Sequence, residues 1–137
     1  MSWDVSVQRF LRGEYGHLNE IPNDENFAPL GSRIEVQQVI STFFPGTDWS
    51  DPEWGRYRSR EGSIEFNMGA DDPMLSFTMH VRASSAISET IVAMCLEARW
   101  QALDYNTGEF LEKTLDPGRG ARQWALYRDQ IVPKPEQ

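Results

Sequence analysis

The sequence predicts an α+β domain: an antiparallel sheet with helices packed on one face, in the ferredoxin-like order β-α-β-β-α-β with an additional C-terminal helix. Three observations lead to this fold class. Segments 63–68 and 75–82 alternate apolar and polar residues across a turn-forming sequence, which is typical of a hairpin. Amphipathic helical patterns flank the hairpin on both sides. A further strand-like segment precedes the first helix, and another follows the second.

The length of 137 residues is that of one domain, 1–137, in which a single hydrophobic core suffices. Hydrophobic residues make up 39% of the chain and include five tryptophans and seven phenylalanines, which favours a packed core over disorder. We expect the last residues, 133–137, to form a mobile tail.

The first predicted element is a strand near the N-terminus, where Trp3, Val5 and Val7 alternate with polar residues. From Gly13 to Leu30 the chain carries Gly, Pro, Asn and acidic residues with little periodicity, so we expect a long surface loop. Loops of this length are uncommon without a role. This one either connects the strand to the next helix or covers a cleft.

The first helix is predicted from the capping box Ser32-Arg33-Ile34-Glu35, in which serine and glutamate side chains satisfy free backbone N–H groups. Apolar residues follow at helical spacing, and Pro45-Gly46 ends the helix. The segment TDWSDPEW, 47–54, then indicates an acidic turn. GRYRSR, 55–60, is a candidate short strand, and a rival α+β arrangement counts it as the fifth strand of the sheet.

The hairpin has an apolar side and a polar side, because successive side chains on a strand face opposite ways. The apolar side comprises Ile64, Phe66, Met68, Leu75, Phe77, Met79 and Val81. If both helices cover this side, the opposite face must be solvated, covered by a loop or bound by a partner.

Three further elements complete the chain. Ser84 or Ser85 is expected to cap a second helix, whose buried face consists of Ile87, Ile91, Met94, Cys95 and Ala98. ALDY, 102–105, is expected to form a last strand before a turn at 106–108. A C-terminal helix over 121–131 should pack Trp124, Tyr127 and Ile131 inward.

Charge limits the classes of partner. The net charge of −8 and the pI of about 4.7 disfavour nucleic acid and anionic membranes, and favour a basic protein or a cationic ligand. Arg56, Arg58 and Arg60 are bracketed by acidic residues. Cys95 is the single cysteine, so no intramolecular disulfide forms, and we expect it to be a small buried hydrophobe. No signal-like or membrane-spanning segment is recognisable, which favours a cytoplasmic protein.

The candidate binding residues lie on the polar side of the hairpin: Glu65, Asn67, Thr78, His80 and Arg82. Cross-strand neighbours are roughly 5–8 Å apart, so Glu65 can pair with His80 or Arg82. Such a set can bind an anion or relay a proton. Alternating polar residues also serve solubility, and we assign no catalytic residue. The polar residues of the first strand, Asp4, Ser6 and Gln8, join this face if that strand is central.

Two tryptophans, Trp49 and Trp54, lie in the acidic turn. They either pack on the sheet edge or, if exposed, serve as anchors for a partner. The histidines His17 and His80 show no metal-binding spacing, and we expect neither a metal nor another cofactor.

Several short motifs carry a resemblance: the MSWDV start, FPGTDWSDPEWG, SIEFNMG, MHVR and ALDYNTGEFL. Together they make nearly the whole chain similar to a group of short, uncharacterised bacterial proteins. The resemblance implies a small bacterial cytoplasmic protein and carries no activity, cofactor or catalytic residue with it.

The functional hypothesis is a small acidic protein-binding module without catalysis, of an immunity or regulatory type that blocks a basic partner. The alternative is a small-molecule-binding protein or enzyme that uses the open sheet face. A homodimer formed through this face or the hairpin is a third hypothesis.

Overall fold

The computed structural model describes residues 2–131 and confirms an α+β fold with an antiparallel sheet. The strands are β1 (Trp3–Phe10), β2 (Phe27–Ala28), β3 (Asp48–Asp51), β4 (Trp54–Ser59), β5 (Gly62–Asn67), β6 (Ser76–Ala83) and β7 (Gln101–Asp104). The helices are η1 (Leu18–Glu20), α1 (Arg33–Phe43), α2 (Ile87–Ala98) and α3 (Arg119–Ile131). The predicted mobile tail, 133–137, lies outside the described residues.

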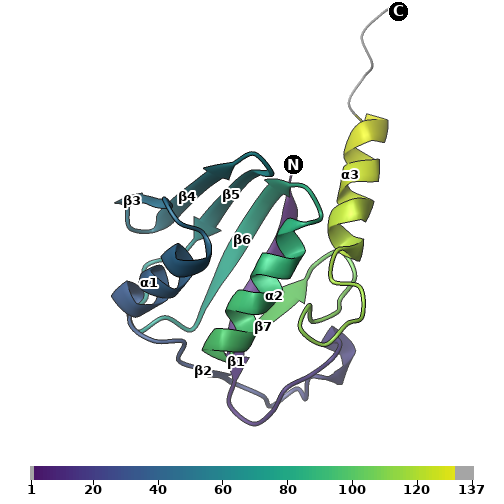
Figure 1. Cartoon of the computed structure of the whole chain (residues 1–137). Coiled ribbons are helices and arrows are strands. Elements are labelled where there is room, and N and C mark those ends of the chain that lie inside the picture. The colour runs from purple at the N-terminus through teal and green to yellow at the C-terminus, as the bar shows by residue number, and fades with distance from the viewer. Residues whose placement is uncertain (1, 132–137) are drawn as a thin grey trace, which may run out of the picture.

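The sheet is larger than predicted. Its seven strands follow the order β2-β1-β6-β5-β4-β3, and β7 also pairs with β1. All of the segment GRYRSR except Arg60 is in β4, as the rival arrangement supposed, whereas β3 forms where only a turn was expected. Helices α1 and α2 lie on one face of the sheet, and α3 stands on the side of α2 away from α1 (Figure 1).

The core lies between that face and the two helices. Trp3, Val5 and Val7 are buried as predicted. The ring of Phe66 on β5 lies 5.6 Å from that of Phe44 and 6.4 Å from that of Phe77, measured between centroids. The helices contribute Val36, Ile40, Ile87, Ile91, Met94 and Cys95, all buried. Cys95 is therefore a small buried hydrophobe, as expected.

The predicted hairpin is confirmed, with Phe66 opposite Met79 in the β5–β6 ladder. One apolar assignment is wrong, because Leu75 precedes β6 and is 41% exposed. Its neighbour Met74 is buried instead. The backbone N–H of Met74 donates to the carbonyl of Gly31, which turns Met74 inward before the strand alternation begins.

The predicted N-cap of α1 is confirmed, whereas that of α2 is not. Ser32 Oγ accepts from the Glu35 backbone N–H, and Glu35 Oε1 accepts from the Ser32 N–H, as the capping box requires. The predicted serine cap of α2 is wrong: its N-cap is Ala86, with no side-chain hydrogen bond. Ser84 donates its hydroxyl to the carboxylate of Glu61 instead.

The long loop between β1 and α1 is tied to the β7 side of the sheet. The backbone N–H of Tyr15 donates to Gln101 Oε1, and Gln101 Nε2 donates back to the Tyr15 carbonyl, at 3.3 and 3.2 Å. Leu18 N–H donates to the carbonyl of Gly108. The loop also contains η1 and β2, so it is more ordered than its composition indicates.

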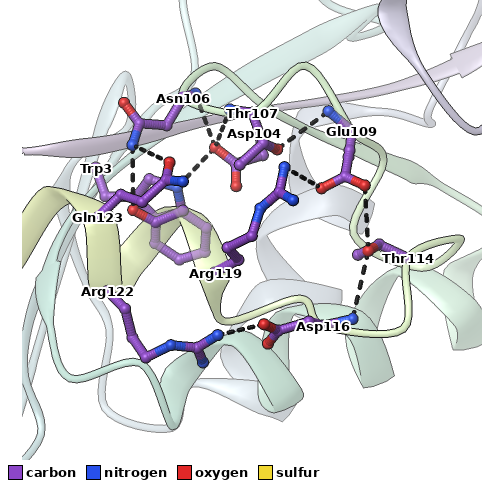
Figure 2. A network of polar contacts seen from close by, with 11 residues as sticks. Trp3, Asp104, Asn106, Thr107, Glu109, Thr114, Asp116, Arg119, Arg122 and Gln123 are labelled. Atoms are coloured by element: carbon purple, nitrogen blue, oxygen red, sulfur yellow. Dashed lines mark hydrogen bonds and ion pairs between the residues drawn. The ribbon is translucent and has the colours of Figure 1, made fainter.

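Helix α3 is held by a buried carboxylate (Figure 2). Asp104, at the end of β7, is 1% exposed and accepts hydrogen bonds from Trp3 Nε1 at 2.9 Å and from the Asn106 backbone N–H at 2.8 Å. Gly120 of α3 packs directly on this carboxylate. Arg119 adds an ion pair with Glu109 at 3.0 Å.

The C-terminal helix is confirmed, but one of its inward residues is not. Trp124 is buried, whereas Tyr127 is 54% exposed, and the residues from Leu126 to Gln130 are all exposed. The side chain of Ile131 lies outside the described part of the chain.

We predict that Gly120→Ala destabilises the docking of α3. An added Cβ would lie 2.0 Å from Asp104 Oδ2, and over-packing of this kind costs about 1–3 kcal/mol. In an exposed helix the same change stabilises by roughly 0.5–1 kcal/mol. The sign of the change in the free energy of unfolding therefore shows whether Gly120 is packed against Asp104. Denaturant titration measures the free energy of unfolding. Leu126→Ala, at a 64% exposed position of α3, is the control. A Gly120→Ala variant as stable as wild type would contradict the docking.

Candidate functional site

The open face of the sheet is the side turned away from α1 and α2. Its polar side chains are half-buried or exposed, apart from the buried Gln8. They come from four neighbouring strands: Asp4 and Ser6 on β1, Thr78, His80 and Arg82 on β6, Ser63, Glu65 and Asn67 on β5, and Trp54, Arg56 and Arg58 on β4.

His80 is at the centre of this face. Its Nδ1 atom lies 2.9 Å from Asp4 Oδ1, the residue directly opposite on β1. The indole ring of Trp54 stacks near the imidazole, with 6.0 Å between centroids and 23° between planes. Because a carboxylate oxygen only accepts, Nδ1 carries the proton in this contact. Asp4 and Trp54 thus fix the orientation of the ring from two sides.

Glu65 and Arg82 form the predicted ion pair, with 2.7 Å between Oε1 and NH1. Of the two partners considered for Glu65, the structure selects Arg82, while His80 contacts Asp4. Both Glu65 and Arg82 are more than a third exposed, so the pair stabilises the fold by about 0–1 kcal/mol at most. Its main effect is to hold two charged groups in fixed places beside His80.

Asn67 and Thr78 are register partners, and Asn67 also lies opposite Trp54. The five predicted residues of β5 and β6 therefore lie on one surface, as expected. Trp54 joins them from the next strand. Asp4 joins them too, because β1 is a central strand.

Trp49 does not belong to this surface. It packs on the helix side, 6.1 Å from Phe66 between ring centroids, and its Nε1 donates to Ser41 Oγ of α1 at 2.9 Å. Gly55 makes room for it, since a Cβ there would lie 2.4 Å from the indole ring. Of the two alternatives for the tryptophans, Trp49 therefore packs on the sheet, and Trp54 stays a candidate anchor for a partner.

Arg56 and Arg58 were not among the predicted site residues. Their alternation within GRYRSR placed them on one side of a strand, but only the β4–β5 register puts Arg56 opposite Glu65. With Glu65 and Arg82 they line a groove of about 620 Å³ at the edge of the open face.

This surface offers hydrogen-bond donors and acceptors, an imidazole and an aromatic ring in a shallow arrangement. Residues 2–131 contain no cluster of three His, Cys, Asp or Glu side chains suited to a metal ion. Within the same residues, no helix has the length and apolar character needed to cross a membrane.

Comparison with known proteins returns no matching family model, curated protein or solved structure. Function must therefore be inferred from the surface itself.

We predict that adjacent residues of β6 differ sharply in their contribution to stability. Met79→Ala removes a fully buried side chain and should cost about 2–5 kcal/mol. His80→Ala truncates a partly exposed side chain and should cost under about 1 kcal/mol. The free energy of unfolding from urea titration checks both. Equal losses would mean that the open face is a structural surface and not one reserved for binding.

Proposed function

We propose that this protein is a non-catalytic protein-binding module, of an immunity or regulatory type, which binds its partner on the open sheet face around Trp54. The observation that carries the proposal is the ordered row Trp54, His80 and Asp4 on a surface facing away from both sheet-covering helices. The ferredoxin-like assignment and a bacterial cytoplasmic origin are parts of the same proposal. The order β7-β1-β6-β5 within the larger sheet supports the former.

The composition of the open face supports an interface. Tryptophan and arginine are the residues most enriched among those that dominate binding energy. Here Trp54 lies on the same face as Arg56, Arg58 and Arg82. The stacking on His80 already restricts the indole ring, so binding would lose less side-chain entropy than with a mobile ring.

The charge beside this face supports a basic partner. Arg33 donates to the carbonyls of Pro52 and Asp71, which brings the β3–β4 turn and the β5–β6 loop together. We call the four exposed carboxylates of these two segments the acidic rim: Asp51, Glu53, Asp71 and Asp72. Glu53 directly precedes Trp54. An acidic rim accelerates encounter with a basic protein, while the centre of the face supplies the contact area.

The alternative function is small-molecule binding on the same face. The groove lined by Arg56, Arg58, Glu65 and Arg82 favours it, because its volume of about 620 Å³ is within the usual range of ligand sites, roughly 300–1,000 Å³. The three guanidinium groups outnumber the two lining carboxylates, those of Asp48 and Glu65, which favours an anionic ligand. It would not need Trp54, which separates the two hypotheses.

The proposal is tested by site-specific photo-cross-linking in the native host. A benzophenone side chain at Thr78, on the open face, should capture one basic protein, whereas the same probe at the exposed Glu97 of α2 should not. With that partner purified, Trp54→Ala should weaken binding by at least about tenfold. Tyr127→Ala, an exposed aromatic on α3, should leave the affinity unchanged.

Charge provides a second readout of the same complex. Replacing Glu53 and Asp71 by their amides should lower the association rate and its dependence on salt, with little change in the dissociation rate. The proposal fails if the Thr78 probe captures no protein, or if Trp54→Ala and Tyr127→Ala bind alike.

A further inference from the structure

A second candidate site lies beside the end of β1 and the last turn of α2. A cavity of about 740 Å³ lies between the end of β1, the last turn of α2 and the start of the long loop, where Gly13 and Glu14 form part of its wall. This volume is in the range of small-molecule sites, roughly 300–1,000 Å³. Phe10, Leu96 and Trp100 supply its apolar lining.

A carboxyl group without a cationic partner faces this cavity. Glu112 accepts from Gln101 Nε2 at 3.0 Å and from the Ala102 backbone N–H at 3.1 Å. Burial raises the pKa of Glu112, and hydrogen bonds to its carboxylate oppose the shift. The nearby Lys113 pairs with Glu14 instead. Among residues 2–131, no cation forms an ion pair with Glu112. A half-buried carboxylate of this kind is stabilised by a positively charged ligand.

An arginine without an anionic partner lies in the same wall. Arg99 ends α2 with φ of 61°, a left-handed conformation usually taken by glycine. Within the described part of the chain its guanidinium has no hydrogen-bond or ion-pair partner. By contrast, Arg9 donates to the carbonyls of Arg99, Pro29 and Ala98. Arg99 is exposed, so its guanidinium is available to a ligand of the cavity, and left-handed backbone at non-glycine residues clusters at functional sites.

Trp100 adds an unsatisfied donor to this wall. Its side chain is 3% exposed, and its indole N–H has no partner among the described residues. A buried donor without an acceptor is unfavourable, so this N–H is a destabilising group in the wall.

We propose that this cavity binds a small zwitterion, with its ammonium group at Glu112, its carboxylate at Arg99 and its apolar body against Phe10, Leu96 and Trp100. Free α-amino acids and short peptides share this chemistry. Arginine and carboxylate form strong charge-assisted hydrogen bonds, and the opposite charges of the two ends match the opposite charges of the wall.

The long loop is linked to this site through one buried amide. Gln101 Nε2 donates both to Glu112 and to the carbonyl of Tyr15 in the loop. The same side chain therefore holds the ligand-facing carboxylate and the loop that walls the cavity. This gives the loop the covering role that its length suggested.

Calorimetry on the full chain tests the proposal with four probes: L-phenylalanine, glycyl-phenylalanine, phenethylamine and 3-phenylpropionate. At least one of the first two should bind saturably, and the better of them identifies an amino acid or a short peptide as the ligand class. The other two probes lack one charge each and should bind at least about tenfold more weakly. Equal binding of a singly charged probe, or no saturation by either zwitterion up to about 10 mM, would overturn the proposal.

Two variants separate binding from folding. Arg99→Gly suits the left-handed backbone, so its melting temperature should equal or exceed that of wild type, while zwitterion affinity falls by at least about tenfold. Glu112→Gln should lose affinity to a similar extent. Arg128→Gln, on the exposed part of α3, is the matched control and should bind as wild type does. Unchanged affinity in folded Arg99→Gly protein would refute the assignment.

Discussion

The burial of one face of β1, β5 and β6 beneath α1 and α2 is the constraint on which the rest of the structure depends. Side chains on a strand alternate with a period of two, so a slip of one residue would move each apolar residue to solvent and each polar residue into the core. The contacts of Phe66 with Phe44 and Phe77 prevent such a slip. Packing on one side thereby determines which groups are available on the other.

The same core explains why α3 needs a polar attachment. Helices α1 and α2 already occupy the sheet face, so α3 packs beside them, with Ala121 and Trp124 as its buried apolar residues. The Asp104 carboxylate compensates by accepting from the Trp3 indole and from two backbone N–H groups after β7. Buried polar groups are favourable only when fully satisfied. The absence of a side chain at Gly120 lets the helix approach this carboxylate closely.

The two proposed sites lie in separate parts of the domain and differ in character. The surface around Trp54 and His80 is shallow and preordered by side-chain contacts, which suits a macromolecule. The cavity near Arg99 and Glu112 is concave, with opposite charges left unpaired in its wall, which suits a small ligand. Neither proposal requires the other, so one can fail while the other stands.

The sequence by itself determined the strand and helix alternation, the Ser32 capping box and the polar set Glu65, Asn67, Thr78, His80 and Arg82. These follow from local periodicity, because a side chain's direction depends only on its position along its own strand or helix. Only the tertiary structure decided which side chains contact one another. The strand register places Asp4 opposite His80, and Arg82 pairs with Glu65. The absence of a side chain at Gly55 leaves room for Trp49 to pack on the helix side. Ser84 donates its hydroxyl to Glu61 and does not cap α2. Each of these depends on residues far apart in the chain, and no local pattern encodes their meeting.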